Sequence, residues 1–392
     1  MIILKVPTEP VFTEYLHTKA SKAGIPLSGT FELTPCCNMA CKMCYVRLTR
    51  QQQEAIGPLY SAEDWISLGQ RAKEQGMLYL LLTGGEPFLR PDFRQILSGL
   101  HSMGLIISIN TNGTLIDEEV VSWLKETPPA RMNITLYGAS DETYARLCDN
   151  PKGFTQVTKA IRLLKDAGIA VKLNCSLTPH NADDLEAIFA FAEQEELRLQ
   201  AGSYMFPPLR RDESMVGRND RFTAEEAAYH SARISCLMYG EEAFLQHMQE
   251  DAPKLVMDEP NGDCPEIPSE GEGMRCRAGK CSFWVTWNGK LLPCGMFPPG
   301  DAENVFETEF MPAWQNVRSF AQTIRLPAKC STCELRDVCK TCAAMVLSET
   351  GEFSRVPQYR CDMAIGYGAA CKQLEEQLLA RRGQTEPENT DG

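Results

Sequence analysis

The residues in this chain with the clearest chemical potential are its cysteines. There are 17 of them, and they are unevenly distributed. Cys37, Cys41 and Cys44 form a C-x3-C-x2-C run, and a second dense group lies between Cys276 and Cys361. Thiolates at such short spacings bind a metal ion or an iron–sulfur cluster more readily than they pack a core. The grouping therefore predicts metal chemistry at two places in the chain.

The bulk composition limits where that chemistry takes place. A length of 392 residues allows one large domain and a smaller one, and 43% hydrophobic with 23% charged residues is typical of a soluble globular protein. The N-terminus has no signal-peptide pattern, and no apolar run is long enough to span a membrane. We therefore expect a cytoplasmic protein with reduced cysteines and no membrane partner. The net charge of −13 argues against nucleic acid as a partner, because phosphate binding needs clustered Lys and Arg.

Short apolar stretches alternate with amphipathic helical stretches in the first half of the chain. We predict strands at 31–34, 78–83, 105–110, 132–136, 171–177 and 200–206, and helices at 61–75, 92–103, 117–125, 153–167 and 181–195. Such alternation is typical of an α/β fold in which crossover helices connect parallel strands. Six units predict a partial (β/α)6 barrel, two units short of the complete TIM barrel.

The predicted domain boundaries follow from this alternation and from composition. We expect an N-terminal extension at 1–30, the barrel at 31–206, a loop and bridging helix at 207–262, a cysteine-rich domain at 263–375 and a disordered tail at 376–392. The segment 207–222 is predicted as an exposed loop and 223–249 as one long helix, and linker composition at 258–275 marks the boundary. Alternating residues around Asn288-Gly289 predict a β-hairpin with a two-residue turn.

The first cysteine group lies on the loop after the first predicted strand. Three thiolates are one too few for a closed zinc site or a fully ligated cubane, so one iron of a [4Fe–4S] cluster would stay open. Here the chain resembles the radical S-adenosylmethionine (SAM) superfamily, whose hallmark is CxxxCxxC on this loop. The resemblance implies that Cys37, Cys41 and Cys44 hold the cluster and that SAM chelates the open iron. A zinc knuckle that takes a fourth ligand from elsewhere is the alternative interpretation.

Further motifs follow the next strands, where barrel active sites form. Adjacent glycines let the backbone approach a ligand closely, and Thr83-Gly84-Gly85-Glu86-Pro87 resembles the GGEP motif that binds the SAM amino group in this family. The resemblance also places polar residues near the SAM ribose and carboxylate, and an apolar or aromatic residue against adenine. In this chain those positions correspond to Asn110, Asn112, Thr135, Arg146, Met43 and Tyr45.

The second cysteine group resembles the SPASM domain, with C-x(9–15)-G-x4-C, then C-x2-C-x5-C-x3-C, then a final Cys. The chain departs once, with x2 in place of the last x3. The resemblance implies two auxiliary [4Fe–4S] clusters, which leave no open iron if all eight thiolates bind. One set is Cys276, Cys281, Cys294 and Cys342; the other is Cys330, Cys333, Cys339 and Cys361. A four-thiolate zinc site at Cys330, Cys333, Cys339 and Cys342 is one alternative. Cys264 is a spare thiol that competes with Cys276 for the first of the eight positions.

The resemblance implies reductive cleavage of SAM to a 5′-deoxyadenosyl radical that abstracts hydrogen from a peptide or protein. The expected result is maturation of a ribosomally made peptide by cross-linking, thioether formation, oxidation or epimerisation. There are three alternatives: a sulfatase-maturing enzyme, a haem-pathway enzyme with a porphyrinoid substrate, and a non-catalytic electron carrier. Gly295 counts against the sulfatase-maturing type, because that type is expected to have an Asp after Cys294. We expect a flavodoxin or ferredoxin-type electron donor.

Substrate-facing residues are less defined in the sequence. Tyr204, Met205, Arg210 and Arg211 lie at or beyond the sixth predicted strand, where they either line the barrel mouth or serve packing and solvation. Only 36 residues precede Cys37, which is too few for an N-terminal leader-binding domain. A separate leader-binding protein is therefore expected to present the peptide, unless none is needed.

Overall fold

The computed structural model describes residues 11–255 and 271–385 and contains one mixed sheet surrounded by helices. The strands are β1 (Ser28–Glu32), β2 (Tyr79–Thr83), β3 (Ile106–Thr111), β4 (Arg131–Thr135), β5 (Val171–Ser176), β6 (Leu199–Gly202), β7 (Ser282–Val285) and β8 (Leu291–Leu292). The helices of the first part are α1 (Val11–Ala23), α2 (Arg50–Ile56), α3 (Ala62–Glu74), α4 (Phe93–Ser102), α5 (Glu118–Leu124), α6 (Asp141–Cys148), α7 (Gly153–Asp166), α8 (Leu185–Gln194), α9 (Ala224–Tyr239) and α10 (Glu241–Leu255). Those of the last part are α11 (Phe310–Thr323), α12 (Ala328–Ser331), α13 (Arg336–Cys339), α14 (Ala343–Thr350) and α15 (Gln358–Thr385).

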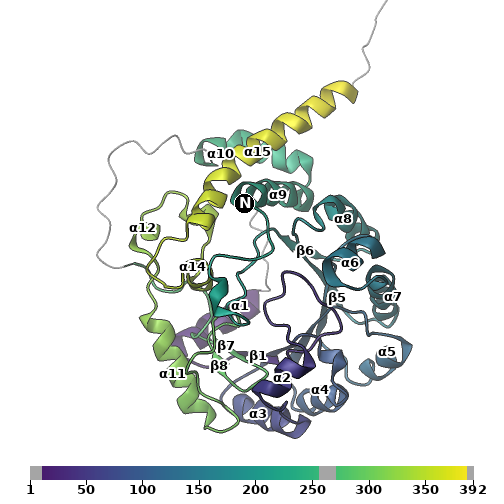
Figure 1. Cartoon of the computed structure of the whole chain (residues 1–392), viewed down its shortest axis with the longest axis vertical. Helices are drawn as coiled ribbons and strands as arrows, with labels where there is room; N and C mark the ends of the chain where they lie inside the picture. The colour runs from purple at the N-terminus through teal and green to yellow at the C-terminus, as the bar shows by residue number, and fades with distance from the viewer. Residues whose placement is uncertain (1–10, 256–270, 386–392) are drawn as a thin grey trace, which may run out of the picture.

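The sheet order is β6-β5-β4-β3-β2-β1-β7-β8, so strands β1 to β6 are neighbours in chain order. All five pairs among them are parallel, with Phe31 opposite Leu82 and Ile109 opposite Met132. Helices α3 to α8 lie around the outside of this arc (Figure 1). The predicted six-unit α/β partial barrel is therefore confirmed. Because the strands are parallel, the loops that follow them meet at one mouth.

Alternating apolar residues explain why these strands form. Leu82, Ile109, Ile134 and Leu173 are completely buried in the main hydrophobic core. The crossover helices contribute one apolar face each, and Trp65 of α3 is the largest side chain that they bury. A sheet covered by helices in this way is typical of parallel strands, which need both faces protected from water.

Two predicted boundaries are wrong for local reasons. The sixth strand ends at Gly202, so Tyr204 and Met205 lie in the loop after it rather than in the sheet. The long helix predicted for 223–249 is two helices, because Gly240 adopts a φ of 89° and ends α9. A left-handed glycine at that position is a common helix stop.

The predicted β-hairpin is present and extends the sheet. Strand β7 pairs in parallel with β1, and β8 pairs antiparallel with β7 through Trp284 opposite Leu292. The connection spans 286–290 and contains Gly289 at a φ of 84°, so it is longer than the two-residue turn predicted. The cysteine-rich part is thus attached directly to the first barrel strand.

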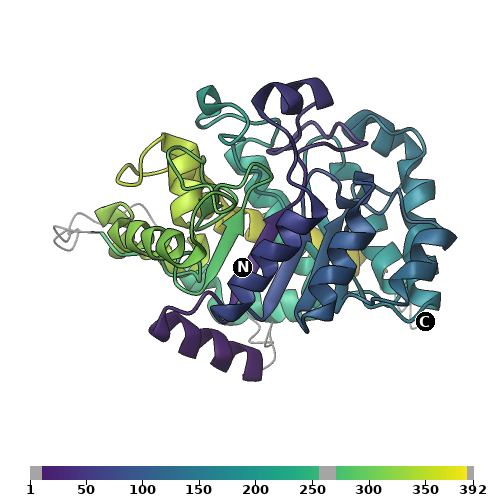
Figure 2. The same cartoon turned by 90° about the horizontal axis from the view of Figure 1, so that it is seen from below.

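The predicted disordered tail is partly helical, and the predicted linker lies largely outside the described residues. Helix α15 continues through Thr385, so the chain is helical over 376–385, where disorder was predicted. The predicted linker falls largely on 256–270, which lie outside the described residues, as do 1–10 and 386–392. Helix α15 packs along α9, and α1 lies beneath the sheet on the side away from α2 (Figures 1 and 2). No described helix is long and apolar enough to cross a membrane.

Candidate active site and cysteine centres

The loop that carries Cys37, Cys41 and Cys44 follows β1 and is fixed by its neighbours. The backbone N–H of Gly85 donates to the carbonyl of Thr34 at 2.6 Å, and that of Glu86 donates to the carbonyl of Cys36 at 2.9 Å. These bonds join the cysteine loop to the turn after β2. The two motifs, which lie one β/α unit apart in the sequence, therefore form one structure at the mouth.

Gly85 is needed because of this contact. A Cβ built at Gly85 would lie 2.3 Å from the carbonyl oxygen of Cys36, a backbone atom that cannot move aside alone. We expect Gly85→Ala to displace the cysteine loop and to lower the iron content of the reconstituted protein. Gly202→Ala is the control, since its Cβ would meet no atom within 4 Å. Equal iron content in the two variants would contradict this role.

Glu86 connects the turn after β2 to the end of β3. Its carboxylate is completely buried and accepts hydrogen bonds from the hydroxyl of Thr111 at 2.8 Å, the N–H of Asn112 at 2.8 Å and the N–H of Phe88 at 3.1 Å. A carboxylate has about four acceptor positions, so most of its capacity is used within the protein. Glu86 therefore organises the mouth, and its role toward the SAM amino group remains a prediction.

The titration of Glu86 gives a testable pH dependence. Burial raises the pKa of this carboxyl to about 7 from its ordinary 4.5, although three donors oppose the shift. Between these values the unfolded chain has already lost the proton that the folded chain keeps, so the free energy of unfolding falls as the pH rises. We expect the cofactor-free protein to lose about 3 kcal/mol over this interval. Urea unfolding of the native protein and Glu86→Gln at several pH values measures it; parallel pH profiles would refute the assignment.

The three thiols of the loop are partly buried. Burial raises the pKa of Cys37 to about 12, and the neighbouring thiols of Cys41 and Cys44 contribute to the shift. Burial likewise raises the pKa of Cys44. The side-chain amide of Asn112 lies 3.6 Å from the Cys37 sulfur and 2.9 Å from the Asn38 oxygen. Three neighbouring thiols on one loop are the donor set that a [4Fe–4S] cluster with one open iron requires.

The other residues predicted to contact SAM include several at or near the ends of β2, β3 and β4. Asn112 lies beside the cysteines, and Asn110 accepts a hydrogen bond from Asn133 at 2.9 Å on the neighbouring strand. Thr135 ends β4 and is partly buried. Pro87 is buried and begins a 3-10 turn at 87–89 that Glu86 caps.

Two residues that were predicted to contact SAM make other contacts within the protein. The guanidinium of Arg146 is exposed and donates to the carbonyl of His180 at 2.7 and 3.0 Å. The side chain of Met43 is 8% exposed and belongs to the main core. Both residues therefore have structural contacts of their own, and their roles toward SAM stay predictions.

Tyr45 lies between the first cysteine group and the cysteine-rich part. The ring is close to Arg210, whose guanidinium carbon is 5.9 Å from its centre. Arg210 makes a bidentate ion pair with Glu32 at the end of β1, with both distances 2.7 Å, and donates to the carbonyl of Gly295 at 2.9 Å. Gly295 follows Cys294 directly. Arg210 therefore joins the first barrel strand to both cysteine sites.

No sequence pattern predicted this ion pair. The prediction that 207–222 is an exposed loop is wrong at its two ends, where Leu209, Arg210 and Phe222 are buried. The indole N–H of Trp284 also donates to Glu32 at 3.1 Å. A glutamate at the end of a buried strand was the available signal, because an unpaired buried charge is rarely tolerated.

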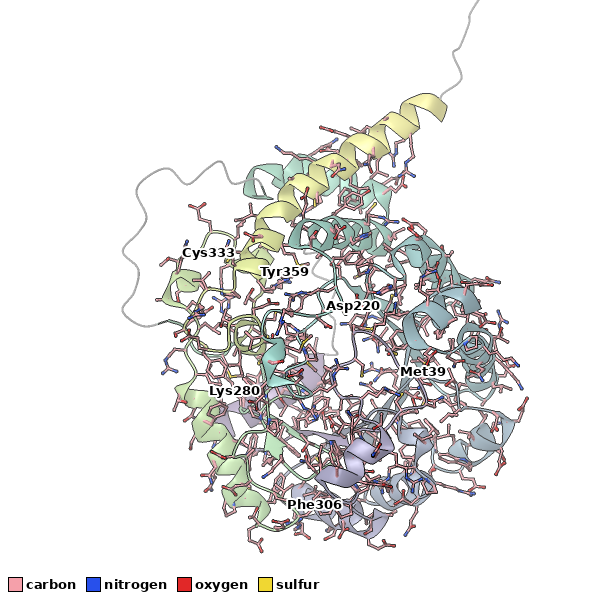
Figure 3. All side chains as sticks on the ribbon, viewed as in Figure 1. Met39, Asp220, Lys280, Phe306, Cys333 and Tyr359 are labelled. Carbon is pink, nitrogen blue, oxygen red and sulfur yellow. The ribbon has the colours of Figure 1, made fainter. Side chains whose placement is uncertain are left out.

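A second ion pair fastens the other end of the same segment. Arg221 contacts Glu349 of α14 at 2.6 Å, and both side chains are buried. The hydroxyl of Tyr204 donates to the same carboxylate at 2.7 Å, and the Arg221 guanidinium lies 3.7 Å from the ring centre of Tyr359. Tyr359 occupies the inner end of α15, where the barrel and the cysteine-rich part meet (Figure 3). Tyr204 therefore serves packing between these parts.

The cysteines of the C-terminal part fall into two sets. Burial raises the pKa of Cys361 to about 11, and the neighbouring thiols of Cys339, Cys330 and Cys333 contribute. Cys333 lies at the outer edge of this part (Figure 3). These four are the thiols predicted for one auxiliary cluster, and they lie near enough to influence one another electrostatically.

In the other set, burial raises the pKa of Cys294 to about 11, with contributions from Cys342 and Cys276. The fourth predicted member, Cys281, is buried in a different apolar cluster with Ala20 and Leu27. Among residues 11–255 and 271–385, no three His, Cys, Asp or Glu side chains converge closely enough to hold a single metal ion. The cysteine groups are therefore loose sets of neighbouring thiols.

With the geometry established, comparison with known proteins assigns the class. Residues 31–192, which contain the cysteine triad and the turn with Glu86, match the family profile of the radical SAM superfamily. The chain is therefore a radical SAM superfamily enzyme. This family implies a [4Fe–4S] cluster and SAM as cofactors.

Two relatives illustrate the range of similar sequences. The AdoMet-dependent heme synthase of Methanosarcina barkeri is 27% identical over 342 residues, which cover 84% of this chain and 94% of the relative. The antilisterial bacteriocin subtilosin biosynthesis protein AlbA of Bacillus subtilis is 28% identical over 276 residues, which cover 70% of this chain and 56% of AlbA. The sequence is thus similar to proteins named for two different products.

Solved structures share the fold over most of the chain. Streptococcus suis SuiB bound to precursor peptide SuiA has a TM-score of 0.63 at 18% identity, covering 88% of this chain and 79% of SuiB. Native anSMEcpe with bound AdoMet has a TM-score of 0.65 at 16% identity, covering 91% of this chain and all of that one. At these identities the similarity concerns architecture.

Proposed function

We propose that this enzyme abstracts hydrogen from a peptide or protein substrate and thereby matures a ribosomally made peptide. When bound, the [4Fe–4S] cluster and SAM supply the reducing electron and the 5′-deoxyadenosyl radical for this step. Residues of this chain would bind and position these cofactors. Cys37, Cys41 and Cys44 provide the thiolates, and Glu86 keeps the turns after β2 and β3 together around them.

The observation that carries the proposal is the open sheet that supports this site. The strand order begins at β6 and ends at β8, so the sheet of the described residues does not close into a barrel. An open arc leaves room for a substrate much larger than SAM to approach the mouth from the side. A shared fold with SuiB in its complex with a precursor peptide and similarity to the bacteriocin biosynthesis protein AlbA support the same class of substrate.

A porphyrin substrate is the second candidate. The heme synthase of M. barkeri aligns with this chain over 94% of its own length. A cavity of about 340 Å³ in the cysteine-rich part is lined by Arg275, Arg336 and Lys340, and cationic side chains suit the carboxylates of a porphyrin. Hydrogen abstraction from either substrate would use the same three cysteines, Cys37, Cys41 and Cys44.

The proposal includes two auxiliary [4Fe–4S] clusters in the cysteine-rich part. The neighbouring thiols of Cys330, Cys333, Cys339 and Cys361 support one of them, and those of Cys276, Cys294 and Cys342 support the other. It also includes a cytoplasmic location, an electron donor of flavodoxin or ferredoxin type, and a separate leader-binding protein.

Anaerobic reconstitution followed by product analysis tests these statements in order. We expect about twelve irons per chain, at four per cluster, whereas about four would contradict the auxiliary clusters. With dithionite and SAM, we expect 5′-deoxyadenosine, and its absence would favour an electron carrier. Mass spectrometry of precursor peptides encoded near the gene, and of an iron-porphyrin precursor, then separates the two substrate classes. A mass change confined to the porphyrin would refute the peptide proposal.

A further inference from the structure

Asn112 belongs to a closed ring of hydrogen-bonded side chains beside the first cysteine group. Its amide nitrogen donates to the side-chain oxygen of Asn38 at 2.9 Å, and the amide nitrogen of Asn38 donates to the hydroxyl of Thr114 at 2.9 Å. That hydroxyl donates back to the side-chain oxygen of Asn112 at 2.7 Å. Asn112 and Thr114 are buried, which limits competition from water. The ring therefore holds the Asn112 side chain in one orientation.

The backbone N–H of Thr114 determines which end of the Asn112 amide faces the cysteines. It donates to one end of this amide at 2.9 Å, and because a backbone N–H can only donate, that end is the oxygen. The amide nitrogen therefore lies on the other side, where one of its protons goes to Asn38 and the other to the sulfur of Cys37, 3.6 Å away. An asparagine amide has two donor and two acceptor positions, and all four are thus used within the protein.

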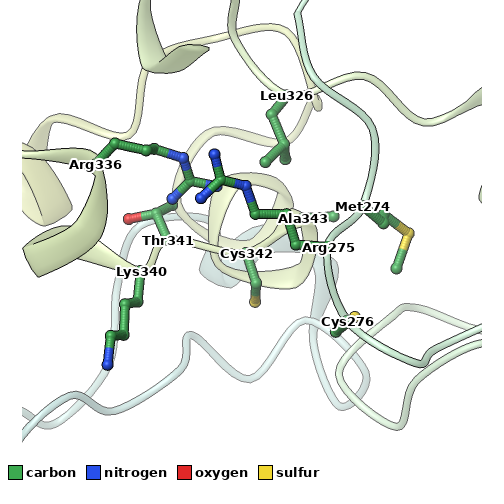
Figure 4. Close-up of a pocket in the computed structure, with 9 residues that line it drawn as sticks. All are labelled: Met274, Arg275, Cys276, Leu326, Arg336, Lys340, Thr341, Cys342 and Ala343. Carbon is green, nitrogen blue, oxygen red and sulfur yellow. The ribbon is translucent and has the colours of Figure 1, made fainter. Parts of the chain in front are cut away.

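The backbone around Asn112 is fixed as well as its side chain. The N–H of Asn112 donates to the buried carboxylate of Glu86 at 2.8 Å. Asn38 belongs to the cysteine loop, so the ring of side chains joins that loop to the end of β3. The N–H of Met39 also approaches the Cys37 sulfur, at 3.4 Å. Cys37 therefore has one N–H donor from its own loop and one from the turn after β3. The cationic cavity of the cysteine-rich part (Figure 4) is separate from this ring, because its lining residues all lie between 274 and 343.

We propose that Asn112 is a positioning residue that donates a hydrogen bond to the cluster-bound thiolate of Cys37 and thereby favours one-electron reduction of the SAM-binding [4Fe–4S] cluster. Reduction adds negative charge to the cluster and its sulfur ligands, and an N–H donor stabilises that charge. The electron comes from the flavodoxin or ferredoxin-type donor, and no other bond changes. Because the amide is fully used, this role replaces the sequence-based expectation that Asn112 contacts SAM. The inference rests on the proposed binding of iron by Cys37, and Cys41→Ala tests that cluster loop separately.

A redox titration of the full-length, reconstituted protein without SAM tests this hydrogen bond. Electron paramagnetic resonance detects the reduced clusters, and the signal that changes when SAM is added to a parallel sample belongs to the SAM-binding cluster. In Asn112→Ala we expect the ratio of reduced to oxidised SAM-binding cluster at a fixed potential to fall about fivefold, as for the loss of one hydrogen bond. Thr114→Val should lower the ratio too, because it removes the hydroxyl that orients the amide. An unchanged ratio in both variants would overturn the proposal.

Iron content and a matched asparagine are the controls for this titration. Thr114→Val decides the test if Asn112→Ala alone loses the cluster; loss from both variants would overturn the proposal, because Asn112 would then hold the loop rather than favour reduction. Asn133 is a buried asparagine of β4 whose amide donates to Asn110 at 2.9 Å rather than to a sulfur. Asn133→Ala should therefore keep the ratio of the parent. An equal fall in Asn133→Ala and Asn112→Ala would show a general effect of losing a buried amide and would contradict the proposal.

The affinity of the oxidised protein for SAM distinguishes a role toward the cluster from a role toward SAM. Equilibrium dialysis with radiolabelled SAM measures it in the parent and in Asn112→Ala. We expect equal affinities, because the hydrogen-bonding positions of the Asn112 amide are used within the protein. Weaker SAM binding together with an unchanged redox ratio would place Asn112 in the SAM site and refute the proposal. Neither measurement needs the substrate, so the result is independent of whether a peptide or a porphyrin is modified.

Discussion

Cys41→Ala is expected to remove about four irons per chain and to abolish SAM cleavage, the largest effect predicted for this enzyme. Cys41 lies on the loop fixed between the turn after β2 and the end of α6, where the N–H of Ala40 donates to the carbonyl of Cys148 at 2.8 Å. Two remaining thiolates cannot hold a cluster that also needs an open iron for SAM. Iron content and 5′-deoxyadenosine formation with dithionite measure the effect.

Cys175→Ala is the matched control for that experiment. Cys175 is a buried thiol of β5 in the same hydrophobic core, and burial raises its pKa to about 12. It lies in a strand rather than on the ligand loop, so iron content and SAM cleavage should match the parent. If Cys41→Ala kept its iron, or if Cys175→Ala lost the same amount, the assignment of the SAM-binding cluster to the C-x3-C-x2-C loop would be wrong.

Arg210→Ala is expected to lower the free energy of unfolding by about 3–5 kcal/mol, because it leaves the Glu32 carboxylate buried without its partner. The Arg210 and Glu32 side chains are 6% and 1% exposed, and the pair has two contacts of 2.7 Å. The variant also loses the donor to the carbonyl of Gly295, beside Cys294. Urea unfolding followed by circular dichroism measures the change.

The adjacent Arg211 provides a control for Arg210. Its side chain is exposed, so Arg211→Ala should change the free energy of unfolding by no more than about 0.5 kcal/mol. Replacing both partners by apolar residues, as in Glu32→Leu with Arg210→Met, should restore most of the stability, because no unpaired charge remains. Similar losses for Arg210→Ala and Arg211→Ala would show that the buried pair does not join the barrel to the cysteine-rich part.

The sequence by itself determined the features that depend on neighbouring residues. The C-x3-C-x2-C spacing and the Gly84-Gly85-Glu86 turn defined the cofactor chemistry, because ligands on one short loop are close in any fold. The alternation of short apolar stretches with amphipathic stretches predicted the six parallel units, because the hydrophobic period and the length of a stretch distinguish a strand from a crossover helix. The hairpin at Asn288-Gly289 was also predicted from neighbouring residues, although its connection is longer than the two-residue turn that was predicted.

Only the tertiary structure decided which distant residues meet. Arg210 and Glu32 are 178 positions apart, and no local pattern indicates that they form a buried pair between two cysteine sites. Cys281 shows the same limit for ligands. Its spacing groups it with Cys276, yet the start of β7 turns its sulfur toward Ser21 in α1. Spacing determines how near two residues can be, whereas packing of the sheet determines the side to which each one points.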